Sequence, residues 1–281
     1  MNGCGGADVQ PPTVRPSRLV LLGDPVAHSL SPVFQNAALR AAGLHARYEV
    51  LQTPAMSLAP TIDMLRRDHA AGNVTVPHKE QFAAHCNLLT DVAARSGAVN
   101  TYWFADDMLV GDNTDVAGAE RALQWVCSER GASHCLLIGA GGSAAALLFA
   151  LQSLGVSSVT ILARNIKRAE ALLQRTGSNA RIVADEPAQL DAFDLVVNAT
   201  PLGMLDDAMP VDVDLLHRKA RVLDVVYRSG GTKFVRRARE LGMHADDGLR
   251  MLVEQGACAF ERWFGFEPDR SVMWQSLGGY R

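Results

Sequence analysis

A glycine-rich turn between a predicted strand and a predicted helix constrains the fold of this chain more than any other feature. The apolar run Cys135–Gly139 is typical of a buried strand, the turn Gly139–Gly142 follows it, and Ser143–Leu154 favours a helix. Glycine permits a tight turn and lets the backbone approach a pyrophosphate, and the helix start offers free N–H groups to phosphate oxygens. We therefore predict a Rossmann-type dinucleotide-binding domain, with the pyrophosphate held by Gly139, Gly141, Gly142, Ser143 and Ala144.

The residues after the next predicted strand, Ser158–Ala163, indicate which dinucleotide binds. Sites for NAD usually place Asp or Glu there, because a carboxylate accepts a hydrogen bond from the ribose 2′-OH. This chain instead has Arg164, Asn165, Lys167 and Arg168 at that point and no carboxylate. The cations are either solvated charges, which the dipole at a helix start disfavours, or ligands of a 2′-phosphate, which suits a guanidinium fork. We predict that the cofactor is NADP rather than NAD and that Arg164, Asn165 and Arg168 contact it.

Composition excludes several other classes of protein. The 281 residues are 48% hydrophobic and 20% charged, which is typical of a globular enzyme, and the net charge of -3 gives no reason to expect a nucleic-acid partner. No C-x-x-C pair occurs among the five cysteines, so we expect no metal site. The uncharged stretch from Gly131 to Ala163 is interrupted by glycines and reads as strand, turn, helix and strand rather than as a membrane span. We expect a cytoplasmic protein without membrane contacts.

Strands and helices alternate along the chain, which favours an α/β fold with largely parallel sheets. We expect a flexible leader over 1–17, a first α/β domain over 18–114, a dinucleotide-binding domain over 115–247, and a C-terminal helical segment over 248–281 that packs on the first domain. In the first domain Arg18–Gly23 and Asn73–Val76 are predicted strands, and Ser31-Pro32 opens a helix in which Ser31 can act as the cap.

Short polar motifs recur at the predicted strand ends. In order along the chain they are Gly23–Pro32 (GDPVAHSLSP), Asn73–Lys79 (NVTVPHK), Gly97–Thr101 (GAVNT), Gly111–Asp115 (GDNTD), Asn198–Met204 (NATPLGM), Asp224–Tyr227 (DVVY) and Asp247–Gln255 (DGLRMLVEQ). In this combination, order and spacing they closely resemble the shikimate dehydrogenase family, from about residue 18 to the end of the chain.

The resemblance implies a substrate-binding catalytic domain followed by an NADP-binding domain, and the reversible reduction of 3-dehydroshikimate to shikimate with NADPH in aromatic amino acid biosynthesis. Motif by motif, it implies that Ser29 and Ser31 hold the substrate carboxylate with Tyr227 nearby. It implies further that the ring hydroxyls are contacted by Thr75, Lys79, Asn100, Asp115 and Gln255. Lys79 and Asp115 would form the catalytic pair. The cofactor would also be contacted by Thr200, Met204, Val225 and Gly248.

The chemistry is reasonable apart from the resemblance. Oxidising a secondary alcohol removes a hydride from carbon and a proton from oxygen. A lysine can exchange that proton if burial lowers its pKa toward the working pH, while a neighbouring Asp opposes the shift but fixes the position of the amine. We therefore expect Lys79 and Asp115 to act as one coupled unit. The alternatives at these positions are structural: Asp115 as a helix cap, Lys79 as a surface lysine.

Some positions depart from the family pattern and leave the substrate open. Arg250 stands where the family usually has Gly, and it could reach the cofactor phosphates or point to solvent. Ala163 and Asn165 replace the usual neighbours of Arg164. A paralogue that acts on quinate, an aminoshikimate or a similar ring acid therefore remains an alternative, as does a non-catalytic NADP-binding redox sensor. We expect a small-molecule substrate and a monomer or homodimer.

Overall fold

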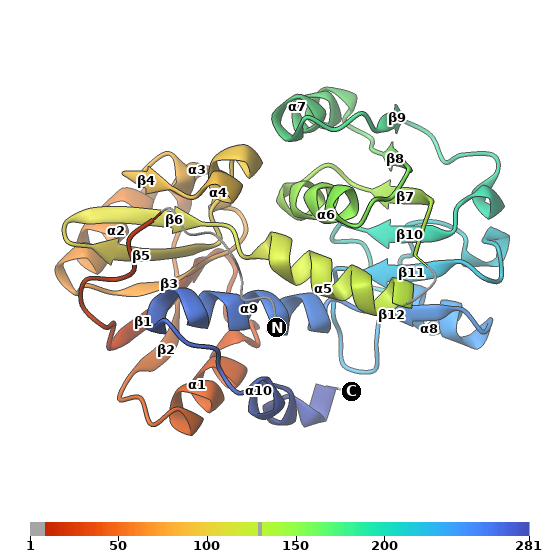
Figure 1. Ribbon diagram of the computed structural model, residues 1–281. Helices are drawn as coiled ribbons and strands as arrows, with labels where there is room; N and C mark the ends of the chain where they lie inside the picture. The colour runs from red at the N-terminus through yellow and green to blue at the C-terminus, as the bar shows by residue number, and fades with distance from the viewer. Residues whose placement is uncertain (1–8, 129–130, 281) are drawn as a thin grey trace. The chain divides into compact units, whose positions relative to one another are not determined.

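The computed structural model describes residues 9–128 and 131–280, and Figure 1 shows its two α/β units. One unit contains the chain through Ala117 together with Val253–Gly278, and the other contains Gly118–Leu252 with the last residues of the chain. The divisions fall inside two helices, α5 (Asp115–Cys127) and α9 (Leu249–Phe264). Of the predicted leader, residues 1–8 lie outside the described part of the chain.

The first unit is built on a mixed sheet of six strands in the order β2-β1-β3-β5-β6-β4. Its elements are β1 (Arg18–Gly23), α1 (Ser31–Ala41), β2 (Arg47–Gln52), η1 (Ala55–Ser57), α2 (Leu58–Arg67), β3 (Ala71–Val74), α3 (Lys79–Ala83), β4 (Leu88–Leu89), α4 (Asp91–Ser96), β5 (Thr101–Ala105) and β6 (Met108–Asp112). Strands β1, β2 and β3 are parallel, as predicted, and β5 is antiparallel to both β3 and β6. The carboxyl ends of β1 and β3 therefore lie at the same edge as the start of β5.

Three local interpretations for this unit were wrong. The strand expected over Asn73–Val76 ends at Val74, so Thr75 lies on the following loop. Ser31 is the first residue of α1 rather than its cap; the hydroxyl of Ser29 instead accepts a hydrogen bond from the Ser31 N–H at 3.2 Å. Asp115, considered above as a helix cap, is the first residue of α5 and not the residue before the helix, and its own N–H donates to Asn113 Oδ1 at 3.2 Å.

Helix α9 holds the C-terminal segment against the first sheet. A Cβ atom on Gly256 would lie 2.5 Å from the Phe34 ring, so only glycine permits this close contact with α1. Gln35 Nε2 donates to the Gly256 carbonyl at 2.9 Å, and Trp263 Nε1 donates to the Tyr102 carbonyl at 3.2 Å. Helix α10 (Arg270–Ser276), which lies within the C-terminal segment predicted to be helical, packs on α1.

The second unit has a fully parallel sheet in the order β12-β11-β10-β7-β8-β9, seen from bottom to top in Figure 1. Its elements are β7 (His134–Ile138), α6 (Gly142–Ser153), β8 (Ser158–Leu162), α7 (Ile166–Thr176), β9 (Arg181–Val183), η3 (Leu190–Ala192), β10 (Leu195–Asn198), η4 (Val213–Leu215), β11 (Arg221–Asp224), α8 (Lys233–Glu240) and β12 (His244–Asp246). From β7 the chain adds β8 and β9 on one side of the sheet and then crosses back to add β10, β11 and β12 on the other, so the strand order reverses between β7 and β10. Parallel α/β sheets bind ligands at the carboxyl ends of the strands beside such a reversal.

Helices of the described residues are all too short or too polar to cross a bilayer. In residues 9–128 and 131–280, no group of three or more His, Cys, Asp and Glu side chains is placed to hold a metal ion.

Candidate active site

The glycine turn lies at the carboxyl end of β7, beside the reversal in strand order. Gly139 has φ +108°, and a Cβ atom there would lie 2.9 Å from Thr200 Cγ2 and 3.1 Å from the Ala199 carbonyl. Glycine is therefore required for both the backbone conformation and the close approach of the loop after β10. No side chain caps the start of α6, so its first N–H groups are available to an anion.

Two exposed arginines lie at the carboxyl end of β8 and the start of α7. The side chain of Asn165 caps α7 by accepting from the Arg168 N–H at 3.0 Å. Arg168 Nη2 lies 3.9 Å from the point where a Cβ atom on Gly141 would be, so its guanidinium lies beside the glycine turn. Neither Arg164 nor Arg168 forms an ion pair with an acid in the described parts of the chain. A basic, carboxylate-free rim at this edge fits a nucleotide that carries a 2′-phosphate.

A buried carboxylate holds the loops that follow β10 and β11. Asp224 Oδ1 accepts from Asn198 Nδ2 at 2.8 Å and from the Val226 N–H at 3.0 Å, and its Oδ2 accepts from Thr232 Oγ1 at 2.8 Å. The other end of the Asn198 amide accepts from the backbone and side chain of Thr200 at 3.0 and 2.7 Å. The DVVY motif contains Asp224, but no local pattern indicated that its carboxylate would join these loops.

The remaining predicted cofactor residues of the second unit differ in accessibility. Met204 is exposed and Val225 is half-buried on the loops that Asp224 holds. A Cβ atom on Gly248 would lie 2.0 Å from the Val225 carbonyl, so the glycine is needed for backbone packing. Tyr227 lies in this unit and is half-buried.

Asp224 should make stability depend on pH. Burial raises its pKa to about 6, against 3.8 for an ordinary Asp, although three hydrogen bonds oppose the shift. Between roughly pH 4 and 6 the folded protein then binds more protons at this site than the unfolded chain, so the free energy of unfolding falls as pH rises through that window. The rise in the pKa of Asp224 corresponds to a loss of about 3 kcal/mol in the free energy of unfolding between low and neutral pH.

We expect Asp224→Asn, which keeps the shape and cannot ionise, to match the wild type near pH 4 and to exceed its stability at pH 7. Urea unfolding at the two pH values measures the difference. Asp247, whose pKa is also raised by burial, remains in both proteins and leaves part of the slope. A stability difference that does not change with pH would contradict the assignment.

In the first unit, Lys79 and Asp115 form a nearly buried ion pair. Lys79 begins α3, Asp115 begins α5, and Nζ lies 2.5 Å from Oδ2, with side-chain exposures of 16% and 8%. At this exposure Lys79 is not a lysine of the open surface. The sequence could pair these residues only through the family resemblance, because 36 positions separate them.

Asn100 and Gln255 complete this polar cluster, which we define as Lys79, Asp115, Asn100 and Gln255. Asn100 Nδ2 donates to Asp115 Oδ1 at 2.8 Å and to Gln255 Oε1 at 3.1 Å. Gln255 comes from α9, far along the chain, and all four side chains belong to the first unit. The structure therefore brings together four of the residues predicted to contact ring hydroxyls.

Ser29, Ser31 and Thr75 lie on loops and helix starts of the same unit. Ser31 is buried, and Ser29 and Thr75 are half-buried. The loops after β1 and β3 are packed tightly, since a Cβ atom on Gly23 would lie 2.5 Å from Thr75 Cγ2.

A second buried carboxylate, not identified from the sequence, anchors the loop that leads to Asp115. Asp112 Oδ1 accepts from Thr90 Oγ1 at 2.6 Å and from the Asn113 N–H at 2.7 Å, and Arg262 Nε of α9 donates to its Oδ2 at 2.8 Å. The buried carboxylate thereby ties the GDNTD segment to Thr90 at the start of α4 and to Arg262 of α9.

Arg250 is engaged within its own unit. Its Nε lies 3.3 Å from Asp246 Oδ2, and its guanidinium carbon lies 4.0 Å from the centre of the Trp125 ring. These contacts account for the arginine without a ligand, and they weaken the reason for inferring an altered substrate from this position.

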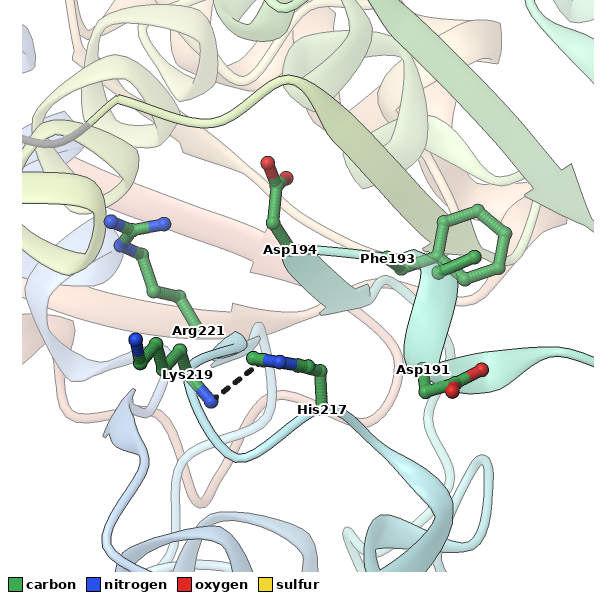
Figure 2. Close-up of a pocket in the computed structure, with 7 residues that line it drawn as sticks. Asp191, Phe193, Asp194, His217, Lys219 and Arg221 are labelled. Carbon is green, nitrogen blue, oxygen red and sulfur yellow. Dashed lines mark hydrogen bonds between the residues drawn. The ribbon is translucent and has the colours of Figure 1, made fainter.

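Figure 2 shows a cavity of about 350 Å³ in the second unit, lined by Asp191, Ala192, Phe193, Asp194, His217, Lys219 and Arg221. It lies at the amino ends of β10 and β11, because Asp194 immediately precedes β10 and Arg221 begins β11. The glycine turn lies at the carboxyl edge of the same parallel sheet. The cavity is therefore at the wrong edge to be the dinucleotide site.

The fold and these residues define a class of protein: an α/β protein with one unit suited to a dinucleotide and another holding a buried Lys–Asp–Asn–Gln cluster. Family models cover most of the chain. The shikimate dehydrogenase substrate-binding domain matches residues 21–102, shikimate/quinate 5-dehydrogenase matches 121–205, and the shikimate 5'-dehydrogenase C-terminal domain matches 248–277.

Individual relatives agree. A shikimate dehydrogenase (NADP(+)) of Symbiobacterium thermophilum is 41% identical, with 92% of each chain covered. The structure of shikimate 5-dehydrogenase from Thermus thermophilus, in complex with NADP(H) and shikimate, has a TM-score of 0.85 and 37% identity over 93% of this chain and 98% of that one. Quinate dehydrogenase from Corynebacterium glutamicum, in complex with NAD, has a TM-score of 0.83 and 29% identity over 93% and 98%. The chain belongs to the shikimate dehydrogenase family, which confirms the resemblance and the two-domain α/β fold predicted from the sequence.

Proposed function

We propose that this protein is an NADP-dependent shikimate dehydrogenase that reversibly reduces 3-dehydroshikimate to shikimate in aromatic amino acid biosynthesis. The observation that supports it most is the hydrogen-bonded cluster of Lys79, Asp115, Asn100 and Gln255. Its donors and acceptors suit the hydroxyls of a polar ring, and its lysine can exchange a proton with one of them. The family relatives named for NADP and shikimate support the same assignment.

In this proposal Lys79 Nζ gives a proton to the carbonyl oxygen as the ketone is reduced and takes it back during oxidation. Asp115 Oδ2 holds the amine in place, and Asn100 prevents the carboxylate from turning by donating to Oδ1. Ser29 and Ser31 donate to the substrate carboxylate with Tyr227 nearby, and Thr75 and Gln255 contact ring hydroxyls. NADP, when bound, supplies and accepts the hydride.

The cofactor residues of the proposal lie on the loops of the second unit. The pyrophosphate is held at Gly139, Gly141, Gly142, Ser143 and Ala144. Arg164 and Arg168 contact the 2′-phosphate, with Asn165 beside them. The nicotinamide end is contacted by Thr200, Met204, Val225 and Gly248. Gly248 contributes through its backbone, which packs closely against that of Val225.

The double variant Arg164→Ala, Arg168→Ala tests the cofactor preference. Each guanidinium forms charge-assisted hydrogen bonds that at an exposed site are worth about ten-fold in binding, so kcat/KM for NADPH should fall about 100-fold. The value for NADH should hardly change. Arg181→Ala, on β9 of the same sheet, is the matched control. Equal losses with both nucleotides, or a wild-type preference for NADH, would contradict the phosphate assignment.

Reduction of NADP by shikimate in a steady-state assay tests the proposed reaction. A panel of shikimate, quinate and aminoshikimate, ranked by kcat/KM, separates the proposal from a paralogue that prefers another ring acid. Tight NADP binding with no turnover on any of them would favour the redox-sensor alternative. A cytoplasmic location and a monomeric or homodimeric state are part of the proposal, and light scattering during gel filtration tests the second of these.

A further inference from the structure

A series of buried polar side chains is hydrogen-bonded to Asn100 of the polar cluster in the first unit. Tyr48 on β2, Asn73 on β3 and Thr101 on β5 are 1%, 5% and 0% exposed, and the proposed function gives none of them a role. Buried polar groups are unfavourable unless hydrogen-bonded, so the bonds that they make decide how each can be oriented.

The directions of these bonds follow from atoms that can only accept or only donate. Asn73 Nδ2 donates to the carbonyl of Asn100 and to Thr101 Oγ1, both at 3.0 Å. Because a carbonyl only accepts, the amide nitrogen of Asn73 must face it, and Oδ1 must face Tyr48. The Tyr48 hydroxyl therefore donates to Asn73 Oδ1, at 2.7 Å.

The carboxamide of Asn100 is oriented in the same way. Its Oδ1 accepts from the Thr114 N–H at 2.8 Å and from Thr101 Oγ1 at 3.0 Å. Its Nδ2 must then face Asp115 and Gln255. The Thr101 hydroxyl, whose oxygen accepts from Asn73, has two acceptors within reach, Asn100 Oδ1 at 3.0 Å and Thr114 Oγ1 at 2.9 Å, and Thr114 Oγ1 itself donates to Asn100 Oδ1 at 3.1 Å. Thr101 is thus linked to Asn100 Oδ1 both directly and through Thr114. The bonds from Tyr48 to Asn100 form one consistently directed series.

Tyr48 also touches the other end of the proposed substrate site. Burial raises the pKa of Tyr48 well above its ordinary value, so the hydroxyl stays protonated, and the nearby Ser31 side chain opposes part of that rise in pKa. Asn36 of α1 holds the backbone of Tyr48 on both sides, with Nδ2 donating to its carbonyl at 2.8 Å and Oδ1 accepting from its N–H at 2.9 Å. These bonds hold the backbone of Tyr48 against α1, the helix that Ser31 begins.

We propose that Tyr48 is a positioning residue for the reaction, acting through Asn73 and Thr101 to orient Asn100 toward Asp115. Its hydroxyl connects the serine assigned to the substrate carboxylate with the cluster assigned to the ring hydroxyls. The inference rests on the proposed function for its kinetic test and on the structure alone for its spectroscopic test.

The kinetic test compares two buried tyrosines in the full-length protein. Tyr48→Phe should lower kcat for shikimate oxidation about 10- to 100-fold, the usual effect of losing a residue that orients catalytic groups, with KM for NADP unchanged. Tyr102→Phe is the matched control: it removes a hydroxyl that is equally buried but donates only to the Val20 carbonyl at 3.2 Å. It should lose stability and keep kcat.

Thr101 provides a second, independent pair in case Tyr48→Phe does not fold. Thr101→Ser keeps the hydroxyl and should retain kcat, whereas Thr101→Val loses the link to Asn100 and should show the same defect as Tyr48→Phe. Equal kcat in the serine and valine variants would overturn the proposal, and so would equal kcat in the two tyrosine variants.

The spectroscopic test does not depend on turnover. The side-chain amide signal of Asn100 in a two-dimensional NMR spectrum should move in Tyr48→Phe and Thr101→Val and stay in place in Tyr102→Phe and Thr101→Ser. If the wild type does not oxidise shikimate, the proposed function fails while this comparison still decides the inference. An Asn100 signal that is unmoved in Tyr48→Phe would overturn it.

Discussion

Lys79→Ala should lower kcat for shikimate oxidation by about 10²- to 10⁴-fold, the usual range for removing a proton-transfer group. In the proposed reaction no other amine of the first unit's cluster can take the hydroxyl proton. The truncation also leaves Asp115 buried without its cation, although Asn100 still donates to it. Stopped-flow absorbance at the nicotinamide band measures the hydride step directly.

The variant needs a control for folding and one for charge. NADP binding, followed by fluorescence titration, should be unchanged, because the residues assigned to the cofactor lie in the second unit. Lys233→Ala, at the exposed start of α8, removes a lysine outside the cluster and should keep full activity. A Lys79→Ala protein that retained kcat would remove the lysine from the proposed mechanism.

Gly248→Ala should strongly destabilise the second unit. Its Cβ atom would lie 2.0 Å from the Val225 carbonyl, and because that carbonyl is backbone and the Cβ has no rotamer, no side-chain rotation can relieve the overlap. Overpacking of this kind costs about 1–3 kcal/mol or more. Each kcal/mol lowers the Tm by about 2–4 °C in a chain of this size, so we expect a loss of roughly 3–10 °C.

NADP affinity should fall with it, because the displaced Val225 belongs to a loop assigned to the cofactor. Gly278→Ala is the matched control, since a Cβ atom on Gly278 meets nothing within 4 Å. Calorimetry of both variants compares the two effects. A Gly248→Ala protein as stable as Gly278→Ala would show that the loops can separate without loss.

The second unit could be predicted from the sequence better than the first. The strands predicted over Cys135–Gly139 and Ser158–Ala163 match β7 and β8 to within one residue, because parallel strands and their helices alternate regularly there and each carries its own apolar pattern. In the first unit the antiparallel pairing of β5 with β3 and the two-residue β4 depend on contacts between distant segments, which local patterns do not encode. For the same reason Thr75 was placed on a strand and lies on a loop.

The site residues likewise divide into those that local patterns predict and those that depend on contacts between distant segments. Gly139 and the two arginines could be inferred from local spacing, since a turn and a helix start are made of neighbouring residues. The partnership of Asp112 with Arg262, and that of Asp224 with Asn198, join positions far apart in the chain. A buried carboxylate cannot be distinguished from an exposed one until the fold has brought its donors to it.

The exposure of Arg164 and Arg168 has a consequence for how such a protein can change over generations. Neither side chain caps a helix or pairs with an acid of the described chain, so exchanging them should cost folding almost nothing. The buried series from Tyr48 to Asp115 is interlocked, and a new substrate preference there would require several substitutions at once. Nucleotide preference should therefore drift among descendants of this protein much faster than the choice of ring acid.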